Sequence, residues 1–253
     1  MINPMDMTGK TVLVTGASAG IGRATCVLLS ELGARVCLIA RNEENLLKTV
    51  SMMRDNGHFI LPFDLQNVAQ IPSLIPQAVE HLAPLDGLVH SAGISRLKAL
   101  HLLSLEDDVR PMMDLHFNAA VMLAQGMRKR GMHAPQGSIV FLSSVSALTG
   151  GKGIGIYAAA KAALIGLTHV LGSELAPAGI RVNSVVPGLV RTDMYEASAK
   201  NLTDEQLKGN SNAYPLGIGR PRDVANAIVF LLSNASSWIT GSSLLVDGGA
   251  TVS

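Results

Sequence analysis

A tyrosine and a lysine stand four residues apart in the segment Tyr157-Ala-Ala-Ala-Lys161. On a helix, this spacing places both side chains on one face. A free tyrosine has a pKa of about 10, too high for a good proton shuttle at neutral pH, and a nearby ammonium lowers it by favouring the phenolate. The pair therefore suits proton transfer, and the three alanines leave room for a flat ligand against the helix. The alternative is a chance pair on a solvated surface.

A glycine-rich segment, Thr15-Gly-Ala-Ser-Ala-Gly-Ile-Gly22, follows an apolar run and opens a helix-like stretch. Glycines permit a tight turn and let the backbone approach a pyrophosphate, while a helix N-terminus supplies free N–H groups and a positive dipole end. The spacing is G-x-x-x-G-x-G rather than the standard G-x-G-x-x-G. Its position between a strand and a helix predicts a nucleotide-binding turn, with a plain strand-to-helix connection as the alternative.

The end of the second predicted strand, Leu38-Ile-Ala-Arg-Asn42, bears on the choice of nucleotide. An acidic residue about 20 positions beyond the glycines would bind a free ribose 2′-hydroxyl. No carboxylate stands at this strand end, and Arg41 can offer a 2′-phosphate two parallel hydrogen bonds from a cation. The sequence favours NADP(H), with NAD(H) as the other cofactor that could bind. Alternatively, Arg41 is a solvated residue at the start of a helix.

Short apolar segments alternate with helix-length segments along the chain. Several of the apolar segments are apolar on both faces, as buried parallel strands are. This alternation predicts one domain of the α/β class, a doubly wound parallel sheet of about seven strands with helices on both faces. The expected strands are 11–15, 35–40, 58–63, 87–91, 138–143, 181–186 and 244–247. The expected helices are 21–32, 43–56, 66–82, 105–130, 157–176 and 223–234.

The segment 189–219 interrupts this alternation, because it contains no predicted strand and carries several polar residues. Ligands of such sheets bind beyond the carboxyl ends of the strands, so an insertion after the sixth strand is in place to cover a substrate. We predict a substrate lid here, with an ordinary pair of surface helices as the alternative.

The composition limits the classes of protein to which the chain can belong. The chain has 253 residues, a formal net charge of +1, 48% hydrophobic residues and 15% charged residues. This composition excludes a disordered chain, and the near-neutral charge argues against a nucleic-acid partner. Cys26 and Cys37 form no disulfide framework and are expected to be buried apolar residues. We see no run of about 20 apolar residues and no export signal, so we expect a cytoplasmic protein without a membrane span.

Together with further short motifs, these residues make the chain resemble the classical short-chain dehydrogenase/reductase (SDR) family from about Gly9 to Gly249. Each motif is short, but their order and spacing agree, which makes the joint pattern specific. The family's Rossmann-type fold is the fold that the resemblance implies. The motifs are Thr15-Gly-Ala-Ser-Ala-Gly-Ile-Gly22, Asp64-Leu65, Ser91-Ala-Gly93, Asn118, Ser143-Ser144, Tyr157-x-x-x-Lys161, Pro187-Gly-Leu-Val-Arg-Thr192 and Asp247-Gly-Gly249.

The resemblance implies four catalytic residues. Tyr157 is the general acid in carbonyl reduction and the base in alcohol oxidation. Ser144, 13 residues before it, donates a hydrogen bond to the substrate oxygen, with Ser143 as the competing candidate. Lys161 lowers the pKa of Tyr157 and holds the nicotinamide ribose. Asn118 positions a water that relays protons towards Lys161, unless it only satisfies backbone groups within a helix.

The resemblance also implies a set of cofactor contacts. Asp64 faces the adenine amino group, or else only caps the following helix. The backbone of Val190 and the side chain of Thr192 hold the nicotinamide carboxamide, or else belong to a plain loop. The full set is Gly16, Ser18, Gly20, Ile21, Gly22, Arg41, Asn42, Asp64, Leu65, Ser91, Ala92, Gly93, Tyr157, Lys161, Pro187, Gly188, Val190 and Thr192.

The sequence departs from the family pattern after the fourth strand. The family commonly shows Asn-Asn-Ala-Gly there, whereas this chain has His90-Ser-Ala-Gly93. Backbone approach to the cofactor survives, because the alanine and glycine remain. His90 is then either a hydrogen-bonded structural residue or a contact of the cofactor region. The other histidines show no metal-ligand spacing, so we predict no catalytic metal.

These residues predict an NADP(H)-dependent oxidoreductase that interconverts a carbonyl and a secondary alcohol by hydride transfer. Two alternatives stand beside it: a relative that binds the nucleotide without turnover, as a redox sensor or scaffold, and a sugar-nucleotide epimerase or dehydratase. The substrate is a small carbonyl or alcohol. Resemblance is closest to β-ketoacyl-carrier-protein reductases and to sugar or polyol reductases, between which the sequence does not choose.

The resemblance implies a homotetramer, or a homodimer, held by the two long helices, the last helix and the C-terminal strand. The low charge of 157–171 fits a buried face, although a core-facing helix would look similar. A basic cluster, Arg128-Lys-Arg130, could attract an acidic carrier protein, or could simply be a solvated helix end.

Overall fold

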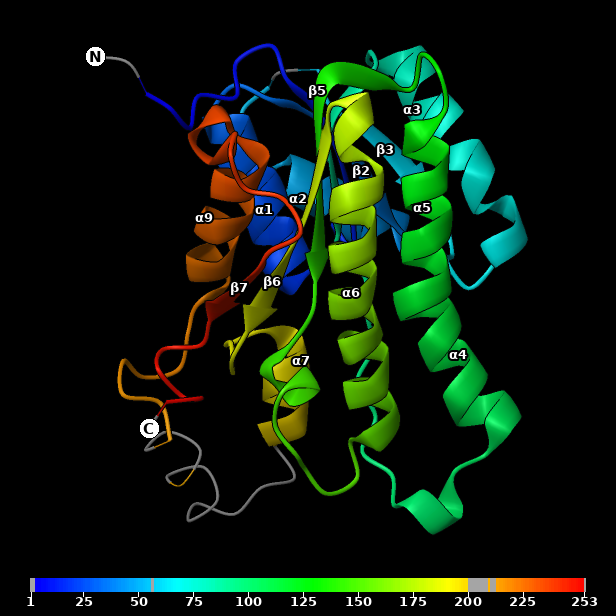
Figure 1. Cartoon of the computed structure of the whole chain (residues 1–253), viewed down its shortest axis with the longest axis vertical. Coiled ribbons are helices and arrows are strands. Elements are labelled where there is room, and N and C mark those ends of the chain that lie inside the picture. Colours follow the sequence, from blue (N-terminus) through cyan, green and yellow to red (C-terminus); the bar gives the residue numbers. More distant parts are fainter. Residues whose placement is uncertain (1–2, 56, 200–208, 210–212, 253) are drawn as a thin grey trace.

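The computed structural model describes residues 3–55, 57–199, 209 and 213–252, and its centre is a sheet of seven parallel strands (Figure 1). The strands lie in the order β3-β2-β1-β4-β5-β6-β7, so the chain winds outward from β1 in both directions. This arrangement confirms the predicted doubly wound α/β fold. The strands are β1 Thr11–Thr15, β2 Arg35–Ala40, β3 Phe59–Pro62, β4 Leu85–His90, β5 His133–Leu142, β6 Ile180–Pro187 and β7 Ser243–Val246.

Helices cover both faces of this sheet, with α1 and α9 on one side and α5 and α6 on the other in Figure 1. The helix α2 packs with the first group and α3 with the second. The helices are α1 Gly20–Glu31, α2 Glu43–Val50, α3 Leu74–His81, α4 Arg110–Met113, α5 Ala119–Arg128, α6 Gly155–Glu174, α7 Asp193–Ala199 and α9 Pro221–Leu232.

Side chains that alternate along each strand build the two halves of the core. In β1, Val12 and Val14 pack with the α1 and α9 layer, whereas Leu13 packs with the α3, α5 and α6 layer. All three are fully buried, as are most residues of β2 and the second half of β5. Burial on both faces explains why these strands read as continuous apolar runs.

The predicted helix over 105–130 is wrong as a regular α-helix. The chain follows a helical path there, but wide π-type turns at Leu105–Val109 and Asp114–Asn118 flank α4. Pro111 explains the first turn, because proline lacks the N–H that would bond the carbonyl of Asp107. That carbonyl instead accepts from the Arg96 guanidinium at 3.1 Å. The spacing of apolar residues predicts which face of a helix is buried, but it does not predict whether the turns are α-helical or π-type.

The segment 66–82, predicted as one helix, is also not a single regular helix in the structure. A 3-10 turn, Val68–Ser73, contains Pro72 and precedes the short helix α3. The predicted helix over 43–56 ends early, with α2 stopping at Val50. Most other element boundaries lie within one or two residues of the expectation, but β5 begins five residues before the predicted Ser138.

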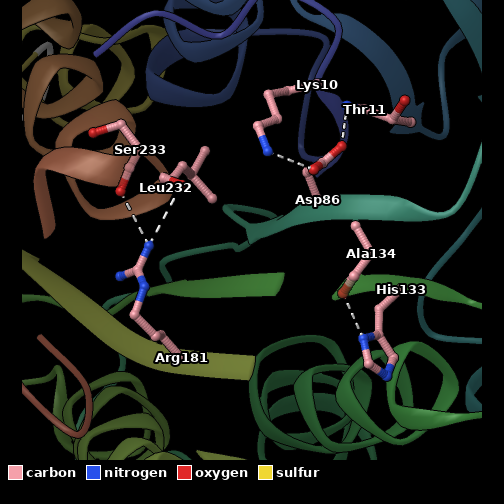
Figure 2. Close-up of polar contacts among 8 residues, drawn as sticks. All are labelled: Lys10, Thr11, Asp86, His133, Ala134, Arg181, Leu232 and Ser233. Carbon is pink, nitrogen blue, oxygen red and sulfur yellow. Dashed lines mark hydrogen bonds and ion pairs between the residues drawn. The ribbon is translucent and has the colours of Figure 1, made fainter. Parts of the chain in front are cut away.

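Charged side chains tie the amino-terminal edge of the sheet to the neighbouring segments (Figure 2). The Asp86 carboxylate accepts from the Lys10 ammonium and from the Thr11 backbone N–H, both at 2.9 Å. On β6, the Arg181 guanidinium donates to the Ser233 carbonyl at 3.2 Å, at the end of α9. A cation there also complements the negative end of the helix dipole. This edge is occupied by structural contacts, and the site is built at the other edge.

By length and composition alone, the 20-residue helix α6 could cross a membrane. A helix packed in a folded domain passes the same test, and α6 packs on β5 and β6 with Leu164 in the core. The segment 189–219, predicted as a lid, includes α7, while residues 200–208 and 210–212 of it lie outside the described part of the chain. Its role as a lid stays a prediction.

Candidate active site

The carboxyl ends of the strands meet at one edge of the sheet, and the loops that leave them surround a cavity of about 430 Å³. A second cavity of about 270 Å³ adjoins it beside the end of β2. Both are lined by Gly16, Ser18, Ala92 and Gly93, so they form one continuous depression. This is the edge where ligands bind in doubly wound sheets.

The predicted site residues divide between these two cavities. Those that line the larger cavity are Gly16, Ser18, Gly20, Ile21, Gly22, Ser91, Ala92, Gly93, Ser144, Tyr157, Lys161, Pro187, Gly188, Val190 and Thr192. Those that line the smaller one are Gly16, Ser18, Arg41, Asn42, Asp64, Leu65, Ala92 and Gly93. Among the described residues, Asn118 is the one predicted site residue that lines neither cavity.

The geometry of the glycine loop fits a bound pyrophosphate. Gly16 has a φ of +67°, and a Cβ there would lie 2.8 Å from the Cα of Ala92. A Cβ on Gly22 would lie 2.2 Å from the Gly16 carbonyl oxygen, so the loop and α1 can pack this closely only with glycine. The N-cap residue of α1, Ala19, provides no side-chain cap, and the first turn holds no acid. The free backbone N–H groups at the start of α1 therefore remain available to an anion.

Arg41 stands at the end of β2 with an exposed side chain and lines the smaller cavity. The carboxamide oxygen of Asn42 accepts from the Asn45 N–H at 2.8 Å and so caps α2. The Asp64 carboxylate accepts from the Gln66 N–H at 3.0 Å within the turn after β3, and the N-cap of the following helix is Asn67 rather than Asp64. Arg41 is thus the cation of this cavity among the described residues.

The two candidate serines differ in what their hydroxyls do. The Ser143 hydroxyl is buried and donates to the Lys161 backbone carbonyl at 2.8 Å, which ties the end of β5 to α6. Ser144 is partly exposed in the larger cavity, where its hydroxyl donates to the Ser146 hydroxyl at 3.2 Å and lowers the pKa of the nearby Tyr157. This geometry supports Ser144, and not Ser143, as the donor to a ligand.

Tyr157 and Lys161 lie on the face of α6 that lines the larger cavity. Burial raises the pKa of Tyr157, against a smaller lowering by the hydrogen bond with Ser144. Burial lowers the pKa of Lys161 to about 7. The ammonium donates to the Leu142 carbonyl at 2.6 Å and lies 5.7 Å from the centre of the Tyr157 ring. The expected lowering of the Tyr157 pKa by Lys161 is therefore not seen in this geometry, because the lysine is bound to the backbone instead.

The structure does not bring Asn118 to these residues. Its amide donates to the Asp114 carboxylate at 2.7 Å, within the same π-type turn. His116, two residues earlier, lines the larger cavity instead, and its ring meets that of Tyr157 edge to face at 5.7 Å between centres. Residues two apart point to opposite sides of a helix, so the turn that presents His116 to the cavity directs Asn118 away from it. The catalytic role expected for Asn118 thus has no geometric support.

His90 is buried behind the cavity at the end of β4. Its Nδ1 lies 2.9 Å from the Thr15 hydroxyl, and its Nε2 lies 3.1 Å from the carbonyls of both Leu115 and His116. Carbonyls only accept, so Nε2 carries the proton and the Thr15 hydroxyl donates to Nδ1. The Thr15 oxygen in turn accepts from the N–H of Ser91 at 3.2 Å. His90 is therefore the hydrogen-bonded structural residue, and it links β1 and the loop after β4 to the π-type turn.

The buried ring of His90 predicts a loss of stability in mild acid. Burial, and then the charge of Lys161, lower its pKa to about 4, while the unfolded chain titrates at about 6.5. The unfolded state binds more protons between these values, so the free energy of unfolding falls as the pH drops. We expect His90 to account for about 2 kcal/mol of this fall between pH 7 and pH 5.

Urea unfolding of the wild type and of His90→Asn at both pH values measures this contribution. The asparagine variant should lose less stability between pH 7 and pH 5 than the wild type. The pKa of His116 is lowered mainly by burial and by Lys161, which both proteins share, so most of its contribution cancels in the difference. His101→Asn, at an exposed site, is the control and should follow the wild type. Equal slopes for wild type and His90→Asn would contradict the assignment.

Two residues of the site escaped the sequence analysis. His116 was judged only for metal-ligand spacing, and the cue that could have found it is an ionisable residue two positions from the expected Asn118. Arg23, on α1, donates to the Ser18 carbonyl and, at 3.1 Å, to the Thr49 hydroxyl, and so holds the glycine loop to α2. In the described part of the chain, no group of three or more His, Cys, Asp or Glu side chains is placed to hold a metal ion.

Comparison with known proteins identifies a family model and relatives that match nearly the whole chain. Residues 16–251 match the family model described as enoyl-(acyl carrier protein) reductase. The chain is 38% identical over 246 residues to the 3-oxoacyl-(acyl-carrier-protein) reductase FabG of Rickettsia felis, covering 97% of this chain and 98% of that one. It is 35% identical to the protein of the same name from Vibrio cholerae, with the same coverage.

Solved structures of related proteins superpose on nearly the full length of this chain. A short-chain type dehydrogenase/reductase from Mycobacterium marinum superposes with a TM-score of 0.89 at 32% identity, covering 99% of this chain and 98% of that chain. A protein from Agrobacterium tumefaciens, provisionally named a 2-deoxy-D-gluconate 3-dehydrogenase and solved with bound NADP, gives a TM-score of 0.88 at 31% identity, with both chains fully covered. With its doubly wound sheet, glycine loop and Tyr157–Lys161 helix face, the chain belongs to the short-chain dehydrogenase/reductase family of oxidoreductases.

Proposed function

We propose that the protein is an NADP(H)-dependent oxidoreductase that interconverts a carbonyl and a secondary alcohol. The observation that carries this proposal is the convergence of Ser144, Tyr157 and Lys161 on a cavity continuous with the glycine loop. A hydrogen-bond donor, a proton donor and a cation within one cavity are what carbonyl reduction needs. Bound NADPH supplies the hydride.

The side chains of the cavity bind the substrate oxygen and transfer the proton. The Ser144 hydroxyl donates to the carbonyl oxygen, where negative charge grows as the carbon is reduced. The Tyr157 hydroxyl gives its proton to that oxygen and becomes a phenolate, with the Lys161 ammonium 5.7 Å from the centre of its ring. In alcohol oxidation, the same tyrosine takes the proton back.

The cofactor preference rests on Arg41. The cation lies in the cavity beside the end of β2, and no acidic residue follows β2 directly to repel a phosphate. A guanidinium recognises a phosphate with two parallel hydrogen bonds. The NADP reported with the Agrobacterium tumefaciens relative supports the same preference.

For the substrate, we propose a neutral 3-oxoacyl thioester. Among the described residues, the larger cavity is lined by one cation, Lys161, which is buried and bound to a backbone carbonyl. A sugar acid would need a further cation for its carboxylate. Apolar side chains such as Val145, Ile154 and Met194 line the cavity and suit an acyl chain. The names of the Rickettsia felis and Vibrio cholerae relatives agree with this class.

Oxidation of NADPH by the purified protein tests this function against a carbonyl panel. The panel holds 3-oxoacyl thioesters, an enoyl thioester, keto-sugars, keto-sugar acids and cyclic ketones, with NADH in parallel. We expect turnover of the 3-oxoacyl thioester. Turnover of the enoyl thioester alone would replace carbonyl reduction by double-bond reduction. NADPH binding with silence across the panel would favour a relative that binds the nucleotide without turnover.

We also propose that the chain assembles as a homotetramer, with a homodimer as the alternative. The helix α6 is mostly apolar, yet Val170 on its outer side is 61% exposed. An apolar helix face of this kind is usually covered by protein. Light scattering should give a mass of two or four chains, and a species of 26.5 kDa alone would contradict assembly.

A further inference from the structure

Tyr214 is partly buried in the wall of the larger cavity, on the segment that leads into α9. Its hydroxyl oxygen accepts a hydrogen bond from the Leu189 N–H at 3.0 Å. A phenol hydroxyl can accept and donate at the same time, but among residues 3–55, 57–199, 209 and 213–252 none accepts the proton of this hydroxyl. The side chain therefore brings an unused hydrogen-bond donor to the cavity.

The backbone around Tyr214 is tied to two neighbouring loops. The Leu216 N–H donates to the Gly248 carbonyl at 3.1 Å, in the loop after β7. The Gly219 N–H donates to the Leu189 carbonyl at 3.1 Å, in the loop after β6. These contacts give the Tyr214 hydroxyl a defined place at the edge of the sheet where the site is built.

Gly188 leaves room for the Tyr214 ring. A Cβ on Gly188 would lie 2.7 Å from the Cε1 atom of Tyr214, and one on Gly248 would lie 3.8 Å from its Cδ1 atom. The ring therefore packs directly on the backbone that follows β6. Because the Leu189 N–H occupies one side of the phenol oxygen, the hydroxyl proton lies on the other side.

Tyr214 stays a protonated phenol in this setting. Burial raises its pKa, the hydrogen bond from the Leu189 N–H lowers it by less, and the charge of Asp247 raises it further. A free tyrosine already titrates at about 10. The hydroxyl is therefore neutral at physiological pH and can donate to a carbonyl oxygen without a change of charge.

A 3-oxoacyl thioester carries a second carbonyl that also needs a partner. One methylene separates its ketone from its thioester carbonyl, so both oxygens enter the cavity together. Ser144 and Tyr157 serve the ketone oxygen. A carbonyl that leaves water without a new donor costs free energy, so a second donor in the cavity favours binding of this substrate.

The Tyr214 hydroxyl and the Ser144 hydroxyl belong to neighbouring strand ends. Ser144 follows β5, whereas Tyr214 packs on Gly188, which follows β6, and the two strands are paired in the sheet. The two hydroxyls thus come from adjacent walls of one cavity. Tyr195 also lines this cavity, but no residue that the structure describes holds its hydroxyl.

We propose that Tyr214 is a specificity-determining residue, whose hydroxyl donates to the thioester carbonyl oxygen while Ser144 and Tyr157 act on the ketone. This inference rests on the proposed function. It predicts that the protein distinguishes a 3-oxoacyl thioester from a ketone without the neighbouring carbonyl. Removal of one oxygen atom from Tyr214 weakens this discrimination.

The test crosses two proteins with two substrates. Tyr214→Phe removes the donor, and a β-keto thioether, in which a methylene replaces the thioester carbonyl, removes the acceptor. We expect Tyr214→Phe to lower kcat/KM about 3- to 10-fold more for the thioester than for the thioether, the range of a neutral hydrogen bond. Wild type and variant meet the same two ketones, so the difference in ketone reactivity cancels in this comparison.

The thioether also separates this role from a structural one. Phenylalanine leaves the Leu189 N–H without its acceptor, and a disturbed loop would affect both substrates and NADPH alike. Equal losses of kcat/KM on the two substrates would overturn the proposal. So would a loss selective for the thioester in Tyr195→Phe with none in Tyr214→Phe.

Binding to the complex with NADP+ gives a readout without turnover, because the oxidised nucleotide cannot reduce a ketone. By calorimetry, the wild type should bind the thioester more tightly than the thioether, and Tyr214→Phe should lose most of this difference. A wild type that turns over neither ketone, but keeps a difference that depends on Tyr214, would refute the proposed function and leave the thioester contact established. A wild type that reduces the thioester, with no such difference in binding or in kcat/KM, would refute the inference alone.

Discussion

Tyr157→Phe should remove nearly all turnover while the protein still binds NADPH. The variant loses one oxygen atom, so the ring keeps its packing against His116 and the cavity keeps its shape. What disappears is the proton that must reach the substrate oxygen. A positioned acid contributes about 100- to 10,000-fold to a rate, and we expect kcat to fall within that range. Steady-state NADPH oxidation measures the loss.

The control for this prediction is cofactor binding. All three tyrosines of the chain line the larger cavity, so none of them serves as a matched control outside the site. NADPH fluorescence titration of Tyr157→Phe should give a dissociation constant close to that of the wild type. Retained turnover would refute the assignment of the proton donor. Loss of turnover together with loss of binding would show a structural effect of the substitution instead.

Arg41→Ala should weaken NADPH binding strongly and leave NADH binding almost unchanged. The guanidinium stands in the cavity beside the end of β2, and only NADPH carries the 2′-phosphate that this cation would bind. A hydrogen bond to a charged group contributes about 1.5–3 kcal/mol, which corresponds to a rise in the NADPH dissociation constant of roughly 10- to 150-fold. Titration with both nucleotides measures the two constants.

Arg222→Ala provides the matched control, because Arg222 is an exposed arginine on α9 paired with Glu31 at 2.6 Å and lines neither cavity. It should bind both nucleotides as the wild type does. An equal weakening of NADPH and NADH in Arg41→Ala would mean that this cation does not touch the 2′-phosphate. A residue other than Arg41 would then have to account for any preference for NADP(H).

The sequence was sufficient where local spacing decides geometry. The four-residue spacing of Tyr157 and Lys161 places both on one helix face, and α6 presents both to the cavity. The glycine loop was likewise readable, because Gly16 and Gly22 stand where a side chain would collide with backbone. Apolar runs identified the seven strands, because strands buried on both faces are mainly apolar on both, although Thr15 and Asn183 are buried polar exceptions.

The sequence was not sufficient where the backbone leaves regular geometry. Apolar periodicity does not distinguish a π-type turn from an α-helical one, and it does not show which of His116 and Asn118 faces the cavity. The direction of the Tyr157 pKa shift also depends on long-range packing. Burial raises this pKa, and the burial of a side chain does not follow from a four-residue spacing.

Transfer of deuterium from 4-deuterated NADPH to a 3-oxoacyl thioester would test the central claim most directly. We expect one deuterium on the carbon that bears the new hydroxyl group, located by mass spectrometry of the product, and incorporation that is at least about 100-fold slower when Tyr157→Phe replaces the wild type. A wild type that binds NADPH in the cavity but transfers no deuterium to any carbonyl of the panel would contradict the account. It would identify a nucleotide-binding member of the family without turnover.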